Sequence, residues 1–346
     1  MYSYHTESVW FIDKVLFFVA ISLGAAVIIY SGTRERFKNS LNRPITGKWH
    51  RIREIIGLGS ANSPDALDIL KKTILNKDED IAYFSMLSLG QIKNNASAGI
   101  LLDFLGDHVF SGHRIVSLLE SFPATIVEDV LKRTYSEDPV VRFWTVKLLS
   151  KFKPAQYAKR IEELAADDSA DVRAAACECL SELGSRQARE RLIGCLNDKM
   201  WFVRMHAVRA LSKILGAECA ADISDSLNDE AWLVRDSVKK AMIHNIEAFL
   251  PLIRDILRSY THIAKDDCVE ALQQSGYLAI LLKNVPSQES MDLLEGVIKA
   301  GGHSGLESAL SAFEPEQRSR IIGVIKGIDA GFGEHIDKKL NNMLNE

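Results

Sequence analysis

The sequence predicts an all-α fold, in which an α-solenoid of helical hairpins follows one transmembrane helix. Two observations lead to this prediction. An uncharged apolar stretch near the N-terminus is long enough to cross a membrane, and a 31-residue repeat recurs in the middle of the chain. The composition, 47% hydrophobic and 25% charged over 346 residues, is that of a folded protein. Because the chain has only 8 prolines and 21 glycines, a long flexible linker is excluded.

Residues 1–33 are predicted to contain the transmembrane helix. The 19 residues from Val15 to Thr33 carry no charge, and the apolar character extends back to residue 9, so membrane contact is assigned to residues 9–33. A helix of this length crosses a hydrocarbon core of about 30 Å. A cleaved signal peptide would need positive residues before the apolar run, and the first twelve residues contain no Lys or Arg. An uncleaved anchor is therefore expected.

The charge changes sign along the chain. Residues 1–53 carry eight Lys and Arg against three acids, whereas the rest carries 34 against 43. Because positive residues flank the cytoplasmic side of a span, residues 34–47 are predicted to be a basic juxtamembrane linker in the cytoplasm. A single-pass protein of the bacterial inner membrane, with its N-terminus outside, is expected. The acidic body disfavours nucleic acid as a partner.

A 31-residue repeat organises the region after the linker. The strings LNDKMWFVR at 196–204 and LNDEAWLVR at 227–235 share six residues in register, and stepping back by 31 gives the Val-Arg pairs at 172–173 and 141–142. Small or apolar residues follow each Val at offsets of four and eight, which places them on one helix face. More degenerate copies extend the predicted array over residues 48–285, and residues 286–346 are predicted to form a C-terminal cap of two or three helices.

Each repeat is expected to hold two helices. The first begins at the Val-Arg pair and the second follows it. A glycine, which tolerates the left-handed conformation, is expected to end the first helix in several repeats. These glycines are Gly90, Gly184, Gly216 and Gly276.

The repeat resembles the HEAT-repeat family, specifically the short repeats of bilin-lyase-like HEAT proteins. The residues that carry the resemblance form an Asp-x(4)-Val-Arg pattern that starts at Asp167, Asp198 and Asp229. The resemblance covers most of the chain after the anchor and implies a solenoid of stacked helical hairpins.

The repeated Asp and Arg residues are predicted to form an ion-pair ladder that joins the repeats. Each Asp can accept backbone N–H groups at the start of the next helix, and each Arg can reach the Asp of a neighbouring turn. A ligand-binding role for the arginines is the alternative. The ladder consists of Asp167, Asp198, Asp229, Arg142, Arg173, Arg204 and Arg235.

Three tryptophans are candidate partner-binding residues. Trp201 and Trp232 stand two residues before their Val, and Trp144 stands three residues after Val141. Each indole either fills a gap between repeats or belongs to an exposed stripe that binds a partner. The sequence leaves both interpretations open.

No motif for catalysis, a cofactor or a metal is found. The glycines at 57 and 59 follow no predicted strand, as a nucleotide-binding loop requires. Cys177 and Cys179 point about 200° apart on a helix, which does not suit zinc. We therefore expect a non-catalytic scaffold without a cofactor that binds another protein. A bilin-lyase-like, chromophore-handling enzyme is the alternative, because the resemblance includes bilin lyases.

Overall fold

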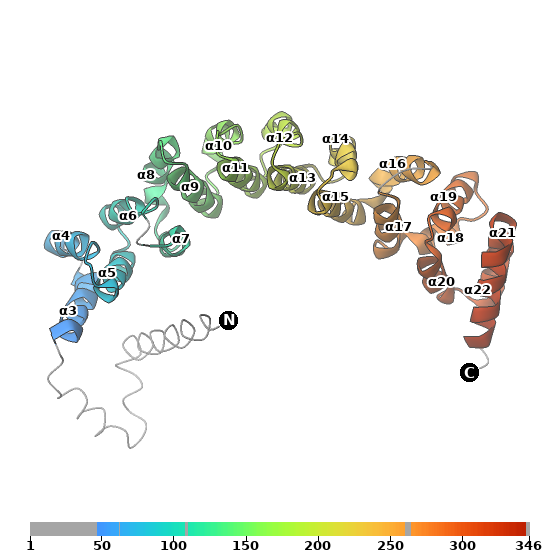
Figure 1. The fold of residues 1–346 in the computed structure, drawn as a ribbon, viewed down its shortest axis with the longest axis horizontal. Coiled ribbons are helices and arrows are strands. Elements are labelled where there is room, and N and C mark those ends of the chain that lie inside the picture. The colour runs from blue at the N-terminus through green and yellow to red at the C-terminus, as the bar shows by residue number, and fades with distance from the viewer. Residues whose placement is uncertain (1–46, 62, 108–109, 260–263, 344–346) are drawn as a thin grey trace, which may run out of the picture. The chain divides into compact units, whose positions relative to one another are not determined.

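The computed structural model describes residues 47–61, 63–107, 110–259 and 264–343, which form helices joined by turns (Figure 1). The predicted transmembrane helix at 9–33 and almost all of the linker at 34–47 lie outside these residues. Within the described part of the chain, no helix is both long and apolar enough to cross a membrane. The chain divides into two compact units at Ile92 and Lys93.

The described part of the first unit is a three-helix arrangement of α3 (Gly47–Ala61), α4 (Pro64–Thr73) and α5 (Glu79–Ile92). Both α3 and α4 pack against α5. Ser63 caps α4 by accepting a hydrogen bond from the backbone N–H of Ala66 at 3.2 Å. Lys48 joins α3 to the start of α5 through Asp78 at 2.8 Å and Asp80 at 2.9 Å.

The second unit is a succession of helices. Its longer elements are α6 (Asn95–Leu102), α7 (Gly112–Leu119), α8 (Val127–Lys132), α9 (Pro139–Phe152), α10 (Ala158–Leu164), α11 (Ala170–Leu183), α12 (Arg189–Cys195), α13 (Trp201–Leu215), α14 (Ala220–Ile223), α15 (Trp232–His244), α16 (Ile246–Arg258), α17 (Lys265–Gln274), α18 (Tyr277–Lys283), α19 (Gln288–Lys299), α20 (His303–Ser311), α21 (Pro315–Ile328) and α22 (Ala330–Met343). Short 3-10 helices lie between them at η1 (Ala124–Ile126), η2 (Arg133–Tyr135), η3 (Ala155–Tyr157), η4 (Arg186–Ala188), η5 (Gly216–Cys219) and η6 (Ser224–Asn228).

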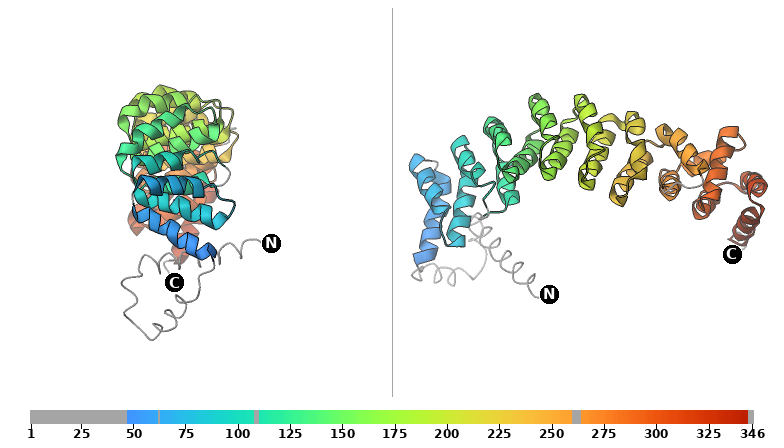
Figure 2. Two further views of the ribbon diagram at one scale, coloured as in Figure 1. Left: turned by 90° about the vertical axis from the view of Figure 1, so that its left-hand side faces the viewer. Right: turned by 45° about the horizontal axis from the view of Figure 1, so that its top comes forward.

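The repeats of the second unit form two layers. Helices α9, α11, α13 and α15 pack side by side in one layer, and α8, α10, α12 and α14 lie in the other (Figures 1 and 2). The side chains at the repeated apolar positions fill the space between the helices. Val172, Val203 and Val234 are fully buried, and so are the residues eight positions after each, Leu180, Leu211 and Met242. The predicted shared helix face is therefore confirmed.

The predicted order of the helices is observed: the helix at each Val-Arg pair is followed by a second helix, as α11 is by α12. In packing, the Val-Arg helix forms a hairpin with the helix before it, as α11 does with α10 and α13 with α12. The Asp turn consequently lies inside the hairpin. Sequence spacing alone does not identify the hairpin, because the connections before and after each Val-Arg helix are both short.

Only three of the four predicted glycines lie at the end of a helix. Gly184, Gly216 and Gly276 have positive φ angles where helices end, but Gly90 lies inside α5, which continues to Ile92. The left-handed residue after α5 is Lys93, with φ of 52°. After Pro286 the described chain forms four helices, α19 to α22, where two or three were predicted.

Candidate protein-binding surface

The predicted ladder residues lie in contact as three bidentate ion pairs. Arg142 donates from Nε and Nη2 to the carboxylate of Asp167 at 2.8 and 2.7 Å. The equivalent distances from Arg173 to Asp198 are 2.6 and 2.8 Å, and those from Arg204 to Asp229 are 2.6 and 2.7 Å. Each arginine lies in the first turn of its helix, and its aspartate lies 25 residues later, in the turn before the next Val-Arg helix. Each pair therefore joins one repeat to the next.

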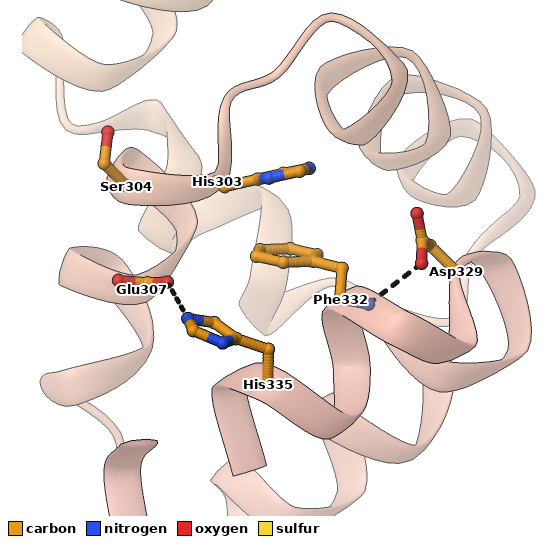
Figure 3. Close-up of a pocket in the computed structure, with 6 residues that line it drawn as sticks. All are labelled: His303, Ser304, Glu307, Asp329, Phe332 and His335. Atoms are coloured by element: carbon orange, nitrogen blue, oxygen red, sulfur yellow. Dashed lines mark hydrogen bonds and ion pairs between the residues drawn. The ribbon is translucent and has the colours of Figure 1, made fainter. Parts of the chain in front are cut away.

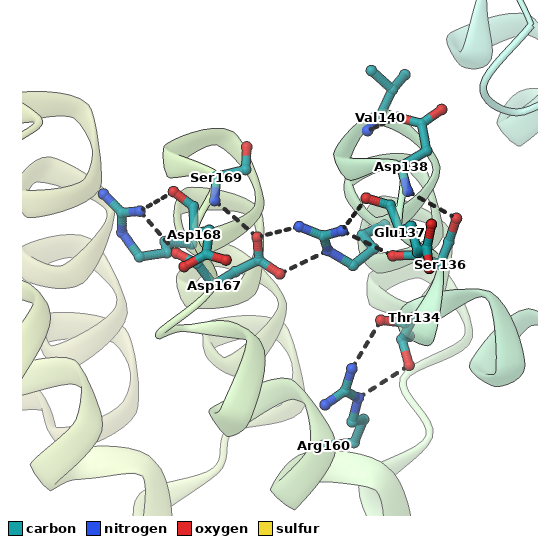
Figure 4. Close-up of polar contacts among 11 residues, drawn as sticks. Thr134, Ser136, Glu137, Asp138, Val140, Arg160, Asp167, Asp168 and Ser169 are labelled. Carbon is teal, nitrogen blue, oxygen red and sulfur yellow. Dashed lines mark hydrogen bonds and ion pairs between the residues drawn. The ribbon is translucent and has the colours of Figure 1, made fainter.

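The third nitrogen of each guanidinium group binds the backbone of its own turn. Arg173 Nη1 donates to the carbonyl oxygens of Asp167 at 2.8 Å and Asp168 at 3.1 Å. The carboxylate of Asp167 also accepts the backbone N–H of Ser169 at 2.9 Å, just before α11 begins (Figure 4). Arg142, Arg173 and Arg204 thus use all three guanidinium nitrogens to hold the turns, and these contacts favour a structural role over ligand binding.

The ladder is partly buried, and its aspartates are stabilised in the charged form. The side chains of the three pairs are 8–14% exposed. Burial alone would raise the pKa of Asp167, Asp198 and Asp229, but the hydrogen bonds from the arginines and from the backbone outweigh it and hold each pKa below its ordinary value.

The ladder weakens at Arg235. Its Nη1 donates to the carbonyl oxygen of Asp229 at 2.7 Å, as in the other repeats, but its Nε lies 3.7 Å from the carboxylate of Asp267. This Nε is buried and has no hydrogen-bond partner among the described residues. The position 31 residues after Asp229 is Tyr260, so the repeat pattern supplies no carboxylate there.

Trp201 and Trp232 are exposed at the same edge of the repeats. They are the first residues of α13 and α15, which pack side by side, and 40% and 64% of their surfaces are exposed. The turns before these two helices are joined by the Arg204–Asp229 pair. The ladder therefore fixes the relative position of the two indoles.

Trp144 lies in a different environment. It is half-buried within α9, its ring is 4.9 Å from that of Phe143 and 6.5 Å from that of His113, and its indole lies against Gly112 at the start of α7. The structure thus separates Trp144 from the other two tryptophans. At the edge, the start of α9 instead presents Val140, which is exposed.

We call this surface the turn edge. It is defined by eight exposed residues in the turns before α9, α11, α13 and α15 and at the starts of those helices: Glu137, Val140, Asp168, Asp171, Lys199, Trp201, Glu230 and Trp232. Within the described part of the chain, no side-chain hydrogen bond or ion pair is found for Glu137, Asp168 and Asp171. Glu230 reaches only Arg204, at 3.6 Å.

Several charged residues on the rest of the repeats form ion pairs between adjacent repeats. On the layer of the Val-Arg helices, Lys147 binds Glu178 at 2.8 Å and Lys213 binds Glu182 at 2.6 Å. On the other layer, Arg189 binds Asp222 at 2.9 Å. These pairs link adjacent repeats. What distinguishes the turn edge is that exposed acids and exposed indoles occur there together.

An open groove of about 480 Å³ lies between α20 and the start of α22 (Figure 3). In it, His303 stacks on Phe332 with ring centroids 3.9 Å apart, and the carboxylate of Glu307 lies 3.7 Å from Nε2 of His335. The groove is also lined by Ser304 and Asp329. Among the described residues, no group of three His, Cys, Asp or Glu side chains is arranged to hold a metal ion. Sequence reasoning missed this groove, because its histidines are 32 residues apart and carry no motif.

Comparisons with known proteins identify HEAT repeats in part of the chain. The family model described as HEAT repeats matches residues 157–243, which run from the start of α10 through most of α15. No curated protein matches the chain.

Several solved structures are similar to the chain. One is YibA of Escherichia coli, at 17% identity and a TM-score of 0.43, over 75% of this chain and 98% of that one. A second is the complex of CpcE and CpcF of phycocyanin lyase from Nostoc sp. PCC7120, at 16% identity and a TM-score of 0.32, over 76% and 94%. A third is Kap121p, at 13% identity and a TM-score of 0.47, over 76% and 34%.

Proposed function

We propose that this protein is a membrane-anchored, non-catalytic scaffold that binds a partner protein through its helical repeats. The observation that carries the proposal is the exposure of Trp201 and Trp232 at equivalent positions of adjacent repeats. Exposed tryptophans contribute a large share of the binding energy at protein interfaces. A row of repeats also presents an extended surface, which suits an extended partner.

The ladder supports this proposal because it makes the surface rigid. The Arg204–Asp229 pair and the backbone contacts of Arg204 connect the two turns that carry the indoles. A surface that is already ordered loses less conformational entropy on binding than a mobile one. The partner therefore meets two aromatic anchors at a fixed spacing.

The anchor is proposed on the sequence alone. Residues 9–33 would cross the bacterial inner membrane once, with the N-terminus outside and the basic residues 34–47 on the cytoplasmic side. The repeats would then hold the partner close to the cytoplasmic surface of the membrane.

Affinity capture from detergent-solubilised membranes tests the proposal. The full chain is compared with the double variant Trp201→Ala/Trp232→Ala, and Trp49→Ala, which removes an exposed tryptophan of the first unit, is the control. We expect a partner protein to be captured by the wild type and the control and to be lost from the double variant.

The same preparation tests the enzyme alternative. A bilin-lyase-like activity would give a coloured adduct when the chain is mixed with a tetrapyrrole pigment and an acceptor protein. A coloured adduct, or a full chain that captures no protein from membranes, would contradict the scaffold proposal.

A further inference from the structure

We infer that the turn edge binds an extended, positively charged segment of the partner protein. This inference rests on the proposed scaffold function and specifies the chemistry of the segment that is bound. It is drawn from three features of the turn edge: its exposed carboxylates, its exposed indoles and the spacing of the helices that carry them.

The carboxylates make the turn edge acidic. The ladder already neutralises Asp167, Asp198 and Asp229, each of which has a bidentate arginine partner. Four exposed acids remain against one exposed lysine: Glu137, Asp168, Asp171 and Glu230 against Lys199. Carboxylates grouped on one surface create a potential that attracts cations and disfavours anions.

The positive ends of the helices do not cancel this potential. Asp138, Asp167, Asp198 and Asp229 each accept a backbone N–H group two residues further on, at 2.8–2.9 Å, where α9, α11, α13 and α15 begin. The backbone N–H groups at these helix starts are therefore already satisfied and are not free to bind an anion. The exposed acids therefore determine the sign of the electrostatic potential at the turn edge.

The indoles add a second contact for the same side chains. A lysine or arginine binds the face of a tryptophan through its charge and packs its alkyl stem along the ring. Glu230 stands two residues before Trp232 in one turn, so a single basic side chain can lie on the indole and reach the carboxylate. In the repeat next to that of Trp201, Asp168 lies in the turn before α11 and Asp171 in the first turn of α11.

The helix spacing sets the pattern of the bound segment. Packed neighbouring helices are about 8–10 Å apart, and an extended chain rises about 3.3 Å per residue. One repeat therefore corresponds to about three residues of an extended segment. We expect basic residues at every third position of the segment to meet successive turns.

Binding of a designed peptide to the full chain in detergent micelles tests the inference. The probe is a fluorescein-labelled (Arg-Ser-Thr)4 peptide, and the controls are (Glu-Ser-Thr)4 and a peptide of the same composition with its four arginines consecutive. We expect the spaced basic peptide to bind and to quench tryptophan emission. The acidic peptide should bind at least about tenfold more weakly, and the clustered peptide should bind more weakly than the spaced one.

Matched variants locate the binding site. The variant Glu137→Gln/Asp168→Asn/Glu230→Gln and the variant Trp201→Ala/Trp232→Ala should each weaken binding by about tenfold or more, a ratio that corresponds to 1.4 kcal/mol. The control Glu190→Gln/Asp225→Asn/Asp255→Asn removes three exposed carboxylates from α12, η6 and α16, outside the turn edge, and should bind as the wild type does. Circular dichroism establishes that each variant is folded.

The outcomes separate this inference from the proposed function. Equal binding of the acidic peptide, or unchanged binding by both turn-edge variants, would overturn the inference. If a partner captured from membranes is lost with the tryptophan variant but kept by the carboxylate variant, the scaffold proposal stands and the inference of a basic segment fails. If no partner is captured by any form of the chain, the proposed function itself fails.

Discussion

Each ladder arginine makes more contacts than an ordinary surface ion pair. Arg204 binds both oxygens of Asp229 and the carbonyl oxygen of Asp198. Replacing it with Ala leaves a carboxylate that is 8% exposed without its main partner. We therefore expect Arg204→Ala to lower the free energy of unfolding by about 1–3 kcal/mol, measured by urea denaturation of the full chain in detergent.

Two substitutions serve as controls for this prediction. Arg235→Ala, at the weak end of the ladder, removes no bidentate pair and should cost less than Arg204→Ala. Arg191→Ala, an exposed residue of α12, should change the free energy by less than about 0.5 kcal/mol. Equal losses for Arg204→Ala and Arg191→Ala would mean that the ladder does not stabilise the fold.

The tryptophans are expected to differ in their contribution to stability. Trp232 is 64% exposed, so Trp232→Ala should lower the free energy of unfolding by less than about 1 kcal/mol. Trp144 is half-buried against α7, and Trp144→Ala should cost about 2–4 kcal/mol because it leaves a cavity. Urea denaturation of the two variants measures this, and a larger loss for Trp232→Ala would show that its indole is a packing residue.

At the scale of the helix, two glycines give a matched test. Gly184 ends α11 with φ of 64°, and Gly194 lies within α12; a methyl group at either would meet no atom within 4 Å. Gly184→Ala should therefore destabilise the protein by about 1–2 kcal/mol through backbone strain alone. Gly194→Ala should stabilise it by up to about 1 kcal/mol, because alanine favours a helix. Thermal unfolding measures both, and shifts of the same sign would contradict the argument.

The sequence predicted the repeated helices and their order, but not all of their ends. The repeated apolar positions, such as Val203 and Leu211, identify a helix because helical periodicity follows directly from residue spacing. Lys153 ends α9 in the left-handed conformation, at the position that Gly184 occupies in the next repeat. Nothing in the identity of a lysine indicates this, because the left-handed conformation is uncommon for residues other than glycine.

The candidate surface was only partly accessible to sequence reasoning. The spacing of Trp201 and Trp232 showed that they are equivalent, and the Asp-x(4)-Val-Arg pattern identified the ladder. Whether the indoles are buried depends on the size of the facing residues in other helices, which one sequence does not reveal. The environment of Trp144 depends on Gly112, which lies in one of the more degenerate copies of the repeat.

At the scale of the whole repeat array, acid should weaken the ladder. The aspartates have a lower pKa in the folded protein than their ordinary value. The stabilisation is therefore complete above about pH 4, the ordinary range of an Asp, and is lost as the pH falls through the lowered folded values. The difference in urea midpoint between the wild type and Arg204→Ala should narrow as the pH is reduced below 4.

This comparison isolates the ladder from other acids. Glu182, whose pKa Lys213 and Lys153 lower to about 2, keeps both partners in the wild type and in the variant, so its titration cancels in the difference. If the difference in midpoint stays constant from neutral pH to pH 3, the ladder aspartates do not carry the stabilising charge.

The proposed orientation of the whole protein rests on the basic residues after the proposed span. Lys and Arg resist translocation, so the end of a span that carries them stays in the cytoplasm. Green fluorescent protein fused after Glu346 should therefore fluoresce, and alkaline phosphatase fused at the same place should be inactive. Replacing the four basic residues of the linker with Gln should lower the fluorescence of the first fusion and raise the phosphatase activity of the second. These residues are Arg34, Arg36, Lys38 and Arg43. Active phosphatase on the unaltered chain would place the repeats outside the cytoplasm, where the proposed partner could not be a cytoplasmic protein.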